Sequence, residues 1–241
     1  MSKVREVSGA QTVDAGGPEG VAALAAAAAA LVPEGGRALL GIAGAPGAGK
    51  TTLAEALVAQ VAAEHGEGFV AHVPMDGYHL ADVQLERLHA LSRKGAPDTF
   101  DADGYAHLLR RIREERDGWV YAPGFDRTLE QPLAAAMVVP PTTRLVVTEG
   151  NYLLLPGGSW PRARAALDEV WFVTVDEGLR HERLVARHVT FGKQPHAART
   201  WVETSDQPNA DLVAPSLARA DRVVHNGPEG WRLLDPAGPA R

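Results

Sequence analysis

One stretch decides the fold of this chain: Gly44-Ala45-Pro46-Gly47-Ala48-Gly49-Lys50-Thr51. It fits the phosphate-binding pattern G-x-x-x-x-G-K-[ST], whose expected context is a strand that leads into the loop and a helix that leaves it. The apolar run Ala38 to Ala43 before the loop is typical of a buried parallel strand, and Lys50 to about Glu64 has a helical pattern. The stretch therefore predicts a bound nucleoside triphosphate.

The residue types in this loop suit each part of a triphosphate with its cation. Glycine allows backbone conformations that a side chain would forbid, so successive N–H groups can point inward around phosphate oxygens. Lys50 supplies positive charge for the β and γ phosphates, and the Thr51 hydroxyl suits a hard cation. We therefore expect ATP and Mg²⁺ as cofactors. The residues expected to bind the nucleotide are Gly44, Ala45, Pro46, Gly47, Ala48, Gly49, Lys50, Thr51 and Thr52.

The composition narrows the class of protein. The formal net charge of -6 argues against a nucleic-acid partner, because a duplex requires a basic surface. The chain has no cysteine, which excludes disulfides, thiolate zinc sites and a cysteine nucleophile and fits a reducing cytoplasm. The alanine-rich run Val21 to Val32 is too short to span a bilayer and indicates a packing helix. We expect a cytoplasmic protein with no membrane partner.

Further apolar runs alternate with helical sequence after the first strand. They are Phe69 to Met75, Arg144 to Thr148 and Val170 to Val175. This alternation predicts an α/β fold in which a doubly wound parallel sheet forms the middle of three layers, the P-loop NTPase fold. A helix is expected from Asp101 to Asp117, and a last short strand from Arg222 to Gly227. Residues 118–121 and 135–139 are expected to pair as a small antiparallel insertion on the substrate side.

The chain is expected to form a single kinase domain over residues 18–235. Residues 1–17 are polar and glycine-rich and are expected to form a flexible arm, and residues 236–241 a tail. No internal repeat is evident. Within the domain, a lid over the nucleotide is expected at approximately residues 187–197.

Carboxylates follow three of the predicted strands, at the edge where open α/β sheets bind ligands. Asp76 would face the γ-phosphate and could accept the proton of an attacking hydroxyl, with a turn or cap role as the alternative. Glu149 stands where phosphate-loop proteins place a carboxylate that supports Mg²⁺, with an ordinary surface glutamate as the alternative. The third is Asp176. We expect Asp76 and Lys50 to be catalytic, and Thr51 and Glu149 to hold the metal.

Two arginines, Arg183 and Arg187, lie four residues apart and so share one helix face. Because the loop-like Phe191-Gly192-Lys193 follows them, they suit a lid that closes over ATP and stabilises charge on the transferred group. The alternative is a solvated basic face paired with Glu182. We expect both arginines to be catalytic.

Two turn-rich segments combine cations with aromatic residues, as surfaces that frame small polar substrates do. They are Arg93-Lys94-Gly95 and Tyr121 to Arg127. His79 is the histidine nearest the expected chemistry, and a merely neighbouring role is an equal alternative to substrate contact. The histidines show no zinc-binding spacing, so no structural zinc site is expected.

Taken together, these segments resemble the superfamily of phosphoribulokinase, uridine kinase and bacterial-type pantothenate kinase. The matching pieces run from about residue 37 to about residue 225. They are Gly44 to Thr51, Met75-Asp76-Gly77-Tyr78-His79, Arg93 to Asp101, Thr148-Glu149-Gly150-Asn151-Tyr152 and the lid-like Arg183 to Lys193. The likeness extends to the branch often labelled nucleoside/nucleotide kinase family or sugar-transport-associated kinase, which shares Arg93-Lys94-Gly95 and Pro123 to Arg127.

The resemblance implies that the carboxylate at Asp76 is the base and that Glu149 supports the metal. The Met-Asp-Gly and Arg-Lys-Gly pieces resemble pantothenate kinase, whereas Tyr-His after Asp-Gly resembles uridine kinase and phosphoribulokinase. The lid departs from the uridine kinase pattern, with Ala186, Thr190 and Phe191 where charged residues are usual. That departure leaves the substrate open. Kinases of this superfamily are often dimers or tetramers, so a homodimer is one expectation.

The sequence as a whole predicts a Mg²⁺-dependent phosphotransferase that moves the γ-phosphoryl of ATP to a hydroxyl of a small metabolite. The acceptor is expected to be a nucleoside, a pantothenate-like molecule or a sugar. The residues expected to bind it are Asp76, Tyr78, His79, Arg93, Lys94, Phe125, Arg127, Glu149 and Asn151. The alternative is an ATPase or switch module without an acceptor, although no Asn-Lys-x-Asp base-reading segment of a GTPase is present.

Overall fold

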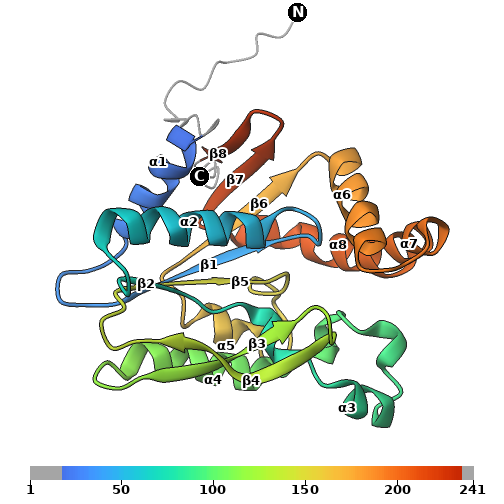
Figure 1. Cartoon of the computed structure of the whole chain (residues 1–241), viewed down its shortest axis with the longest axis horizontal. Coiled ribbons are helices and arrows are strands. Elements are labelled where there is room, and N and C mark those ends of the chain that lie inside the picture. The colour runs from blue at the N-terminus through green and yellow to red at the C-terminus, as the bar shows by residue number, and fades with distance from the viewer. Residues whose placement is uncertain (1–17, 235–241) are drawn as a thin grey trace, which may run out of the picture.

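A six-stranded sheet runs through the computed structural model, which describes residues 18–234 (Figure 1). The strands follow the order β2-β5-β1-β6-β7-β8; the first five are parallel, and β8 pairs antiparallel with β7. They are β1 Ala38–Gly44, β2 Val70–His72, β5 Leu145–Glu149, β6 Glu169–Val175, β7 Arg222–Gly227 and β8 Gly230–Leu234. The arm predicted at 1–17 and the tail predicted at 236–241 lie outside the described residues.

Helices cover both faces of this sheet, and each face has its own buried core (Figure 1). The covering helices are α1 Pro18–Ala29 and α2 Lys50–His65 on one face, and α4 Ala102–Glu114 and α5 Trp160–Arg164 on the other. Leu53 and Trp171 are fully buried in the first core, and Tyr105 and Tyr152 in the second. Every residue of β1 is buried, as expected of a strand covered on both faces. The predicted three-layer α/β fold is confirmed.

The remaining elements gather at the end of the sheet where the phosphate loop lies and along the α4 face (Figure 1). A two-stranded antiparallel hairpin packs on the α4 side, and its strands are β3 Val120–Asp126 and β4 Gln131–Val139. The other helices are α3 Asp82–Arg87, α6 Glu177–Thr190, α7 Pro195–Trp201 and α8 Gln207–Val213. The 3₁₀ segments are η1 Met75–Tyr78, η2 Leu91–Arg93, η3 Pro97–Thr99 and η5 Ala214–Arg219, and η4 Val202–Asp206 is a π-helix.

The structure differs from the sequence prediction at several element ends. The strand predicted from Phe69 to Met75 is only β2, because Pro74 has no N–H for a ladder and the chain then tightens into η1. Helix α1 begins and ends earlier than the predicted Val21 to Val32, since the residue before Pro33 disfavours helix. Strand β8 was not predicted, because the Gly-Pro-Glu-Gly turn before it looks like the end of the ordered chain. The antiparallel insertion is confirmed and longer than predicted.

Within residues 18–234, no helix combines the length and the apolar character that crossing a membrane would require.

A buried arginine ties together the edge of the sheet opposite the phosphate loop. Arg37, which precedes β1, is only 3% exposed and donates from Nε to the Thr143 carbonyl oxygen at 2.8 Å. Its Nη1 donates to the carbonyl oxygens of Ile112 and Glu115 at the end of α4, and Nη2 donates to that of Pro140 at 3.3 Å. Arg37 therefore satisfies orphan carbonyls of a helix terminus and joins α4 to the chain before β5.

Replacing Arg37 with methionine should destabilise the protein by about 2–4 kcal/mol, because several buried carbonyls lose their donor at once. Urea denaturation gives the loss in free energy of unfolding. The matched control is Arg116→Met, since Arg116 makes one exposed hydrogen bond, to the Gly35 carbonyl, and its loss should cost no more than about 0.5 kcal/mol. Equal losses in the two variants would contradict the assigned role of Arg37.

Candidate active site

The phosphate loop joins the end of β1 to the start of α2. Gly47 and Gly49 have φ angles of 79° and 93°, in the left-handed region that favours glycine. A Cβ on Gly49 would lie 2.6 Å from Nδ2 of Asn226, so the loop could not keep its shape with a side chain there. Lys50 begins α2, and its Nζ donates to the carbonyl oxygen of Ala45 at 3.0 Å across the loop. The amides and the ammonium group thus converge where phosphate would bind.

Two side chains that the sequence analysis did not select support this loop from outside. Asn226, at the end of β7, donates from Nδ2 to the Ala48 carbonyl oxygen at 2.9 Å. Arg180, in α6, is 2% exposed and donates from Nη1 to the Pro46 carbonyl oxygen at 3.3 Å. Spacing along α6 could have pointed to Arg180, because it lies one helical turn before Arg183. No sequence signal marks Asn226, whose contact spans most of the chain.

Glu149 ends β5 beside the loop and meets the threonine that follows Lys50. It is 4% exposed, and Thr51 Oγ1 donates to its Oε1 at 3.2 Å. A hydroxyl and a carboxylate oxygen are hard donors, so this pair fits Mg²⁺. Within residues 18–234, no cluster of three or more His, Cys, Asp and Glu side chains could hold a metal. Such a sparse protein donor set suits Mg²⁺, which usually takes further ligands from phosphates and water.

Asp76 reaches the same region from η1, directly after β2. Its Oδ2 accepts a hydrogen bond from Arg127 Nη2 at 3.3 Å, so the β3–β4 hairpin supplies its ionic partner. Asp176, the third carboxylate at a predicted strand end, instead caps α6, where it accepts from the Leu179 N–H at 3.1 Å. The strand-end pattern therefore brings two carboxylates to the site and uses the third as a helix cap.

Burial perturbs the charged groups around the loop in opposite directions. Burial lowers the pKa of Lys50 to about 8, although Glu149 and Asp76 favour its charged form. Burial raises the pKa of Glu149 to about 7, and the negative charge of Asp76 adds to the rise while Lys50 opposes it. All three groups therefore interact electrostatically at one edge of the sheet. A triphosphate with a divalent cation would supply counter-charges for buried Lys50 and Glu149.

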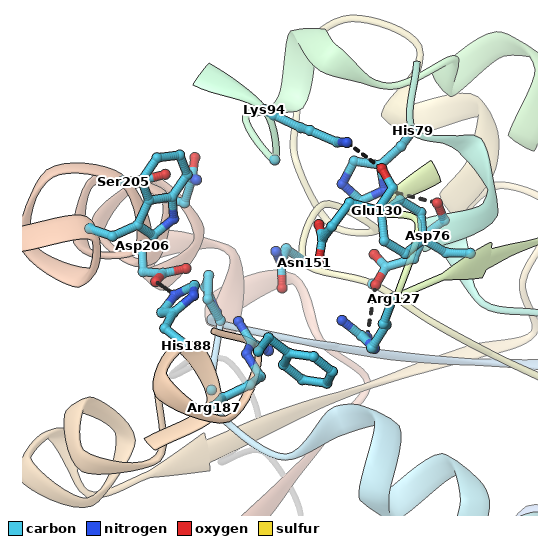
Figure 2. A pocket seen from close by; sticks show the side chains of 18 of the residues that line it. Asp76, His79, Lys94, Arg127, Glu130, Asn151, Arg187, His188, Ser205 and Asp206 are labelled. Atoms are coloured by element: carbon cyan, nitrogen blue, oxygen red, sulfur yellow. Dashed lines mark hydrogen bonds and ion pairs between the residues drawn. The ribbon is translucent and has the colours of Figure 1, made fainter. Parts of the chain in front are cut away.

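These groups open into one cavity of about 420 Å³. Among the residues predicted from the sequence, its lining includes Pro46, Gly47, Lys50, Thr51, Asp76, His79, Lys94, Phe125, Arg127, Glu149, Asn151 and Arg187. Figure 2 shows two facing walls, with His188, Ser205 and Asp206 on one side and Asp76 and Arg127 on the other. The cavity therefore connects the phosphate loop to the base candidate and to the expected lid.

Three of the residues predicted to be catalytic or to bind the acceptor do not line this cavity. Tyr78 packs its ring 5.4 Å from Tyr105 against the buried core, and burial raises its pKa to about 12. The Arg93 side chain is 54% exposed and pairs with Asp98 at 2.8 Å, so it points away from its neighbour Lys94. Arg183 also lies outside the lining, although Arg187 on the next turn of α6 belongs to it.

The lining also contains residues that the sequence analysis did not select for the site. They are Asp82, Leu91, Gly95, Phe100, Glu130, Gly150, His188, Phe191, Lys193, Trp201, Ser205, Asp206 and Asn209. Asp206 lies in the π-helix η4, a rare element that is frequent at functional sites, and pairs with His188 Nε2 at 2.7 Å. Lys193 Nζ lies 4.6 Å from the Trp201 ring centroid. The expected lid includes His188, Phe191 and Lys193, and adenine was expected near the lid and the segment around Asn209 or His225, but the polar run Thr204 to Asn209 has the composition of a loop and did not point to Asp206 itself.

Comparison with known proteins places this site in context. No protein-family model matches the chain. The ATP-dependent kinase-like protein notR' of Aspergillus versicolor is 37% identical over 169 residues, which cover 66% of this chain and 96% of that protein. A protein of Schizosaccharomyces pombe provisionally named uridine kinase is 34% identical over 194 residues, which cover 78% of this chain and 83% of its own length.

A solved structure agrees with these relatives. A protein of Silicibacter sp. TM1040, provisionally named a fructose transport system kinase, is 34% identical to this chain and has a TM-score of 0.73. The alignment covers 81% of this chain and 94% of that one. The two relatives therefore share sequence with this chain over most of its length, and the solved structure shares both sequence and architecture with it.

The raised pKa of Glu149 should make the ligand-free protein less stable as pH rises. Between about pH 4.5 and pH 7 the folded state holds a proton on Glu149 that the unfolded chain has lost, so stability falls across this window. Glu149→Gln removes the effect. We expect the variant to melt a few degrees above the wild type at pH 8 and close to it at pH 4.

Differential scanning calorimetry without ATP or metal measures both melting temperatures. Glu55→Gln, an exposed substitution on α2, is the matched control and should change neither. A Glu149→Gln effect of the same size at both pH values would contradict the perturbed pKa.

Proposed function

Because this chain belongs to the superfamily of ATP-dependent P-loop kinases that act on small molecules, we propose that it transfers the γ-phosphoryl of ATP to a hydroxyl group of its acceptor, with Mg²⁺. One observation carries the proposal. The phosphate loop and Asp76, a carboxylate suited to act as a base, open into the same cavity of about 420 Å³. A module that only hydrolysed ATP would not need a cavity that extends from the phosphate loop to further polar and aromatic side chains such as Asn151 and Phe125.

On the nucleotide side, the loop amides and Lys50 would hold the phosphates. Burial makes the Lys50 ammonium group costly when it stands alone, so a phosphate partner would raise its pKa again and bind it firmly. Arg187 lines the cavity from the last turns of α6 and would stabilise the charge that spreads over the transferred group. In this proposal the residues that bind the triphosphate come from two separate elements, the loop and α6.

On the acceptor side, Asp76 would take the proton of the attacking hydroxyl. Arg127 fixes one carboxylate oxygen, Oδ2, and leaves Oδ1 for the hydroxyl. The Asp76 carboxylate would therefore accept the proton as the oxygen–phosphorus bond forms, while the ADP leaving group takes the electrons of the bond that breaks. Asn151 and Phe125 line the same compartment and would help to orient the acceptor.

Thr51 and Glu149 would hold Mg²⁺ beside the phosphates. Bound there, the ion would neutralise part of the negative charge on the phosphates. The acceptor classes expected from the sequence were a nucleoside, a pantothenate-like molecule and a sugar. The names of the relatives, uridine kinase and fructose transport system kinase, favour the first and the last.

Acceptor-dependent release of ADP should disappear when Asp76 is replaced. The measurement is ADP formation from ATP and Mg²⁺ with a panel of nucleosides, sugars and pantothenate. With the accepted substrate, Asp76→Asn should lower kcat by about 10²- to 10⁴-fold and leave the KM for ATP nearly unchanged, because only the base is lost. Asp98→Asn, on the exposed surface, is the control. ADP formation that ignores both the acceptor and Asp76 would favour the ATPase alternative.

Arg183 and Arg187 of α6 should have different effects in the same assay. Arg187→Ala should lower kcat by about 100-fold or more, because a charge facing the transferred group is lost. Arg183→Ala, one turn away and outside the cavity lining, should stay within about threefold of the wild type. Equal losses in both variants would instead indicate that α6 acts through its stability.

A further inference from the structure

The cations on the two sides of the cavity differ in whether carboxylates pair with them. We call the side formed by η1, α3 and the β3–β4 hairpin the acceptor wall, with Asp76, His79, Asp82, Lys94, Arg127 and Glu130 as its polar residues. Facing it are Lys50, Arg187 and Lys193, none of which has a carboxylate ion pair among residues 18–234. Cations without carboxylate partners therefore lie where the triphosphate would bind.

Each cation of the acceptor wall is already paired with a carboxylate of the same wall. Lys94 Nζ lies 2.6 Å from Asp82 Oδ1, also donates to the backbone carbonyl of Glu130, and sits 5.7 Å from the Phe125 ring centroid. Arg127 pairs with Asp76 at 3.3 Å. A carboxylate or phosphate on the acceptor would have to separate one of these pairs to find a counter-charge.

The groups left over on this wall accept hydrogen bonds. His79 Nδ1 donates to the Asp76 carbonyl oxygen at 2.8 Å, which leaves Nε2 as an acceptor in the neutral ring. Burial lowers the pKa of His79, so the neutral ring is the form at pH 7. The Glu130 carboxylate lines the cavity with no ion pair or side-chain hydrogen bond among the described residues. The wall therefore offers acceptors to a ligand that brings donors.

The backbone holds Glu130 in an unusual conformation. Its φ is 54°, in the left-handed region that glycine and asparagine populate more readily than glutamate. Asp126 fixes the preceding turn by accepting from the N–H groups of Thr128 and Leu129 at 2.8 and 2.9 Å. Figure 2 shows Glu130 beside His79 and facing the region of Asn151. The turn thus places a carboxylate at the cavity, although the backbone conformation of Glu130 is one that glycine and asparagine adopt more readily.

We propose that the acceptor is an uncharged, hydroxyl-rich molecule, a sugar or polyol either free or as part of a nucleoside, and that Glu130 binds hydroxyls other than the one phosphorylated. This inference rests on the proposed kinase function and narrows its substrate class. Carboxylates bind hydroxyl donors through short, charge-assisted hydrogen bonds, whereas an anionic acceptor would meet the negative charge of Glu130 and, within residues 18–234, would find both cations of the acceptor wall already paired.

The test compares acceptors that differ in one charged group. ADP formation is measured with glycerol against D-glycerate, panthenol against pantothenate, D-fructose against D-fructose 6-phosphate, and uridine against UMP. We expect turnover of a neutral member, with kcat/KM at least about tenfold above that of its anionic partner. Comparing turnover of the free sugars and polyols with turnover of uridine shows whether the bound hydroxyls belong to a free sugar or polyol or to a nucleoside.

Glu130→Gln tests the named contact with the preferred neutral acceptor. We expect KM for that acceptor to rise about tenfold or more while KM for ATP stays unchanged, because one charge-assisted hydrogen bond becomes a neutral one. The preference for the neutral member over its anionic partner should also narrow, which a purely structural role would not produce. Glu86→Gln, exposed on α3 and outside the cavity, is the control and should leave all three values unchanged.

The outcomes separate this inference from the proposed function. Acceptor-dependent ADP formation confined to anionic members would overturn the inference and leave the kinase function standing. Unchanged acceptor KM and selectivity in a Glu130→Gln variant with wild-type melting temperature would overturn the role of Glu130. ADP formation that no acceptor stimulates would overturn the proposed function together with the inference.

Discussion

A cluster of buried charges at one edge of the sheet is the constraint on which the site depends. Lys50 and Glu149 are both nearly inaccessible to water, and Asp76 adds a second negative charge to their field. Burial outweighs the attraction between Lys50 and Glu149, and a ligand with charges of both signs would compensate the two buried groups. The buried charges therefore lower the stability of the protein at this edge, and the same charges are positioned to bind phosphate and a cation.

The position of the two carboxylates depends on a small buried network between them. Thr148, just before Glu149, donates from Oγ1 to the Val73 carbonyl oxygen at 2.5 Å, and Tyr105 of α4 pairs with the same hydroxyl. Val73 lies three residues before Asp76, so this hydroxyl links the ends of both strands and fixes one against the other. Arg37 makes a comparable connection at the opposite edge of the sheet, where its hydrogen bonds join α4 to the chain before β5.

Parts of the structure that short-range sequence patterns mark could be predicted, whereas residues that reach the site only through tertiary packing could not. The loop from Gly44 to Thr51, the strands that end near Asp76 and Glu149, and the hairpin insertion all have short-range patterns, and their existence was predicted correctly. Asn226 and Asp206 reach the site only through tertiary packing, so no local pattern marks them. Arg93 shows that a local pattern can also predict too much, because two neighbours in the chain need not lie on the same surface. The Arg93 side chain pairs with exposed Asp98, whereas the Lys94 side chain points inward and pairs with Asp82.

The imbalance between the two walls also bears on how the products would be held. A neutral acceptor becomes an anion once it carries the phosphoryl group, while its hydroxyls still face Glu130 on a wall whose cations, Lys94 and Arg127, are already paired. The wall that would recognise the substrate thus offers the new charge of the product no unpaired cation among the described residues. ADP, by contrast, would remain among Lys50, Arg187 and the loop amides, which have no carboxylate ion pairs within residues 18–234. In the proposed reaction, the charge pattern that selects an uncharged acceptor would leave its phosphorylated form held mainly through the new phosphate, which faces Arg187.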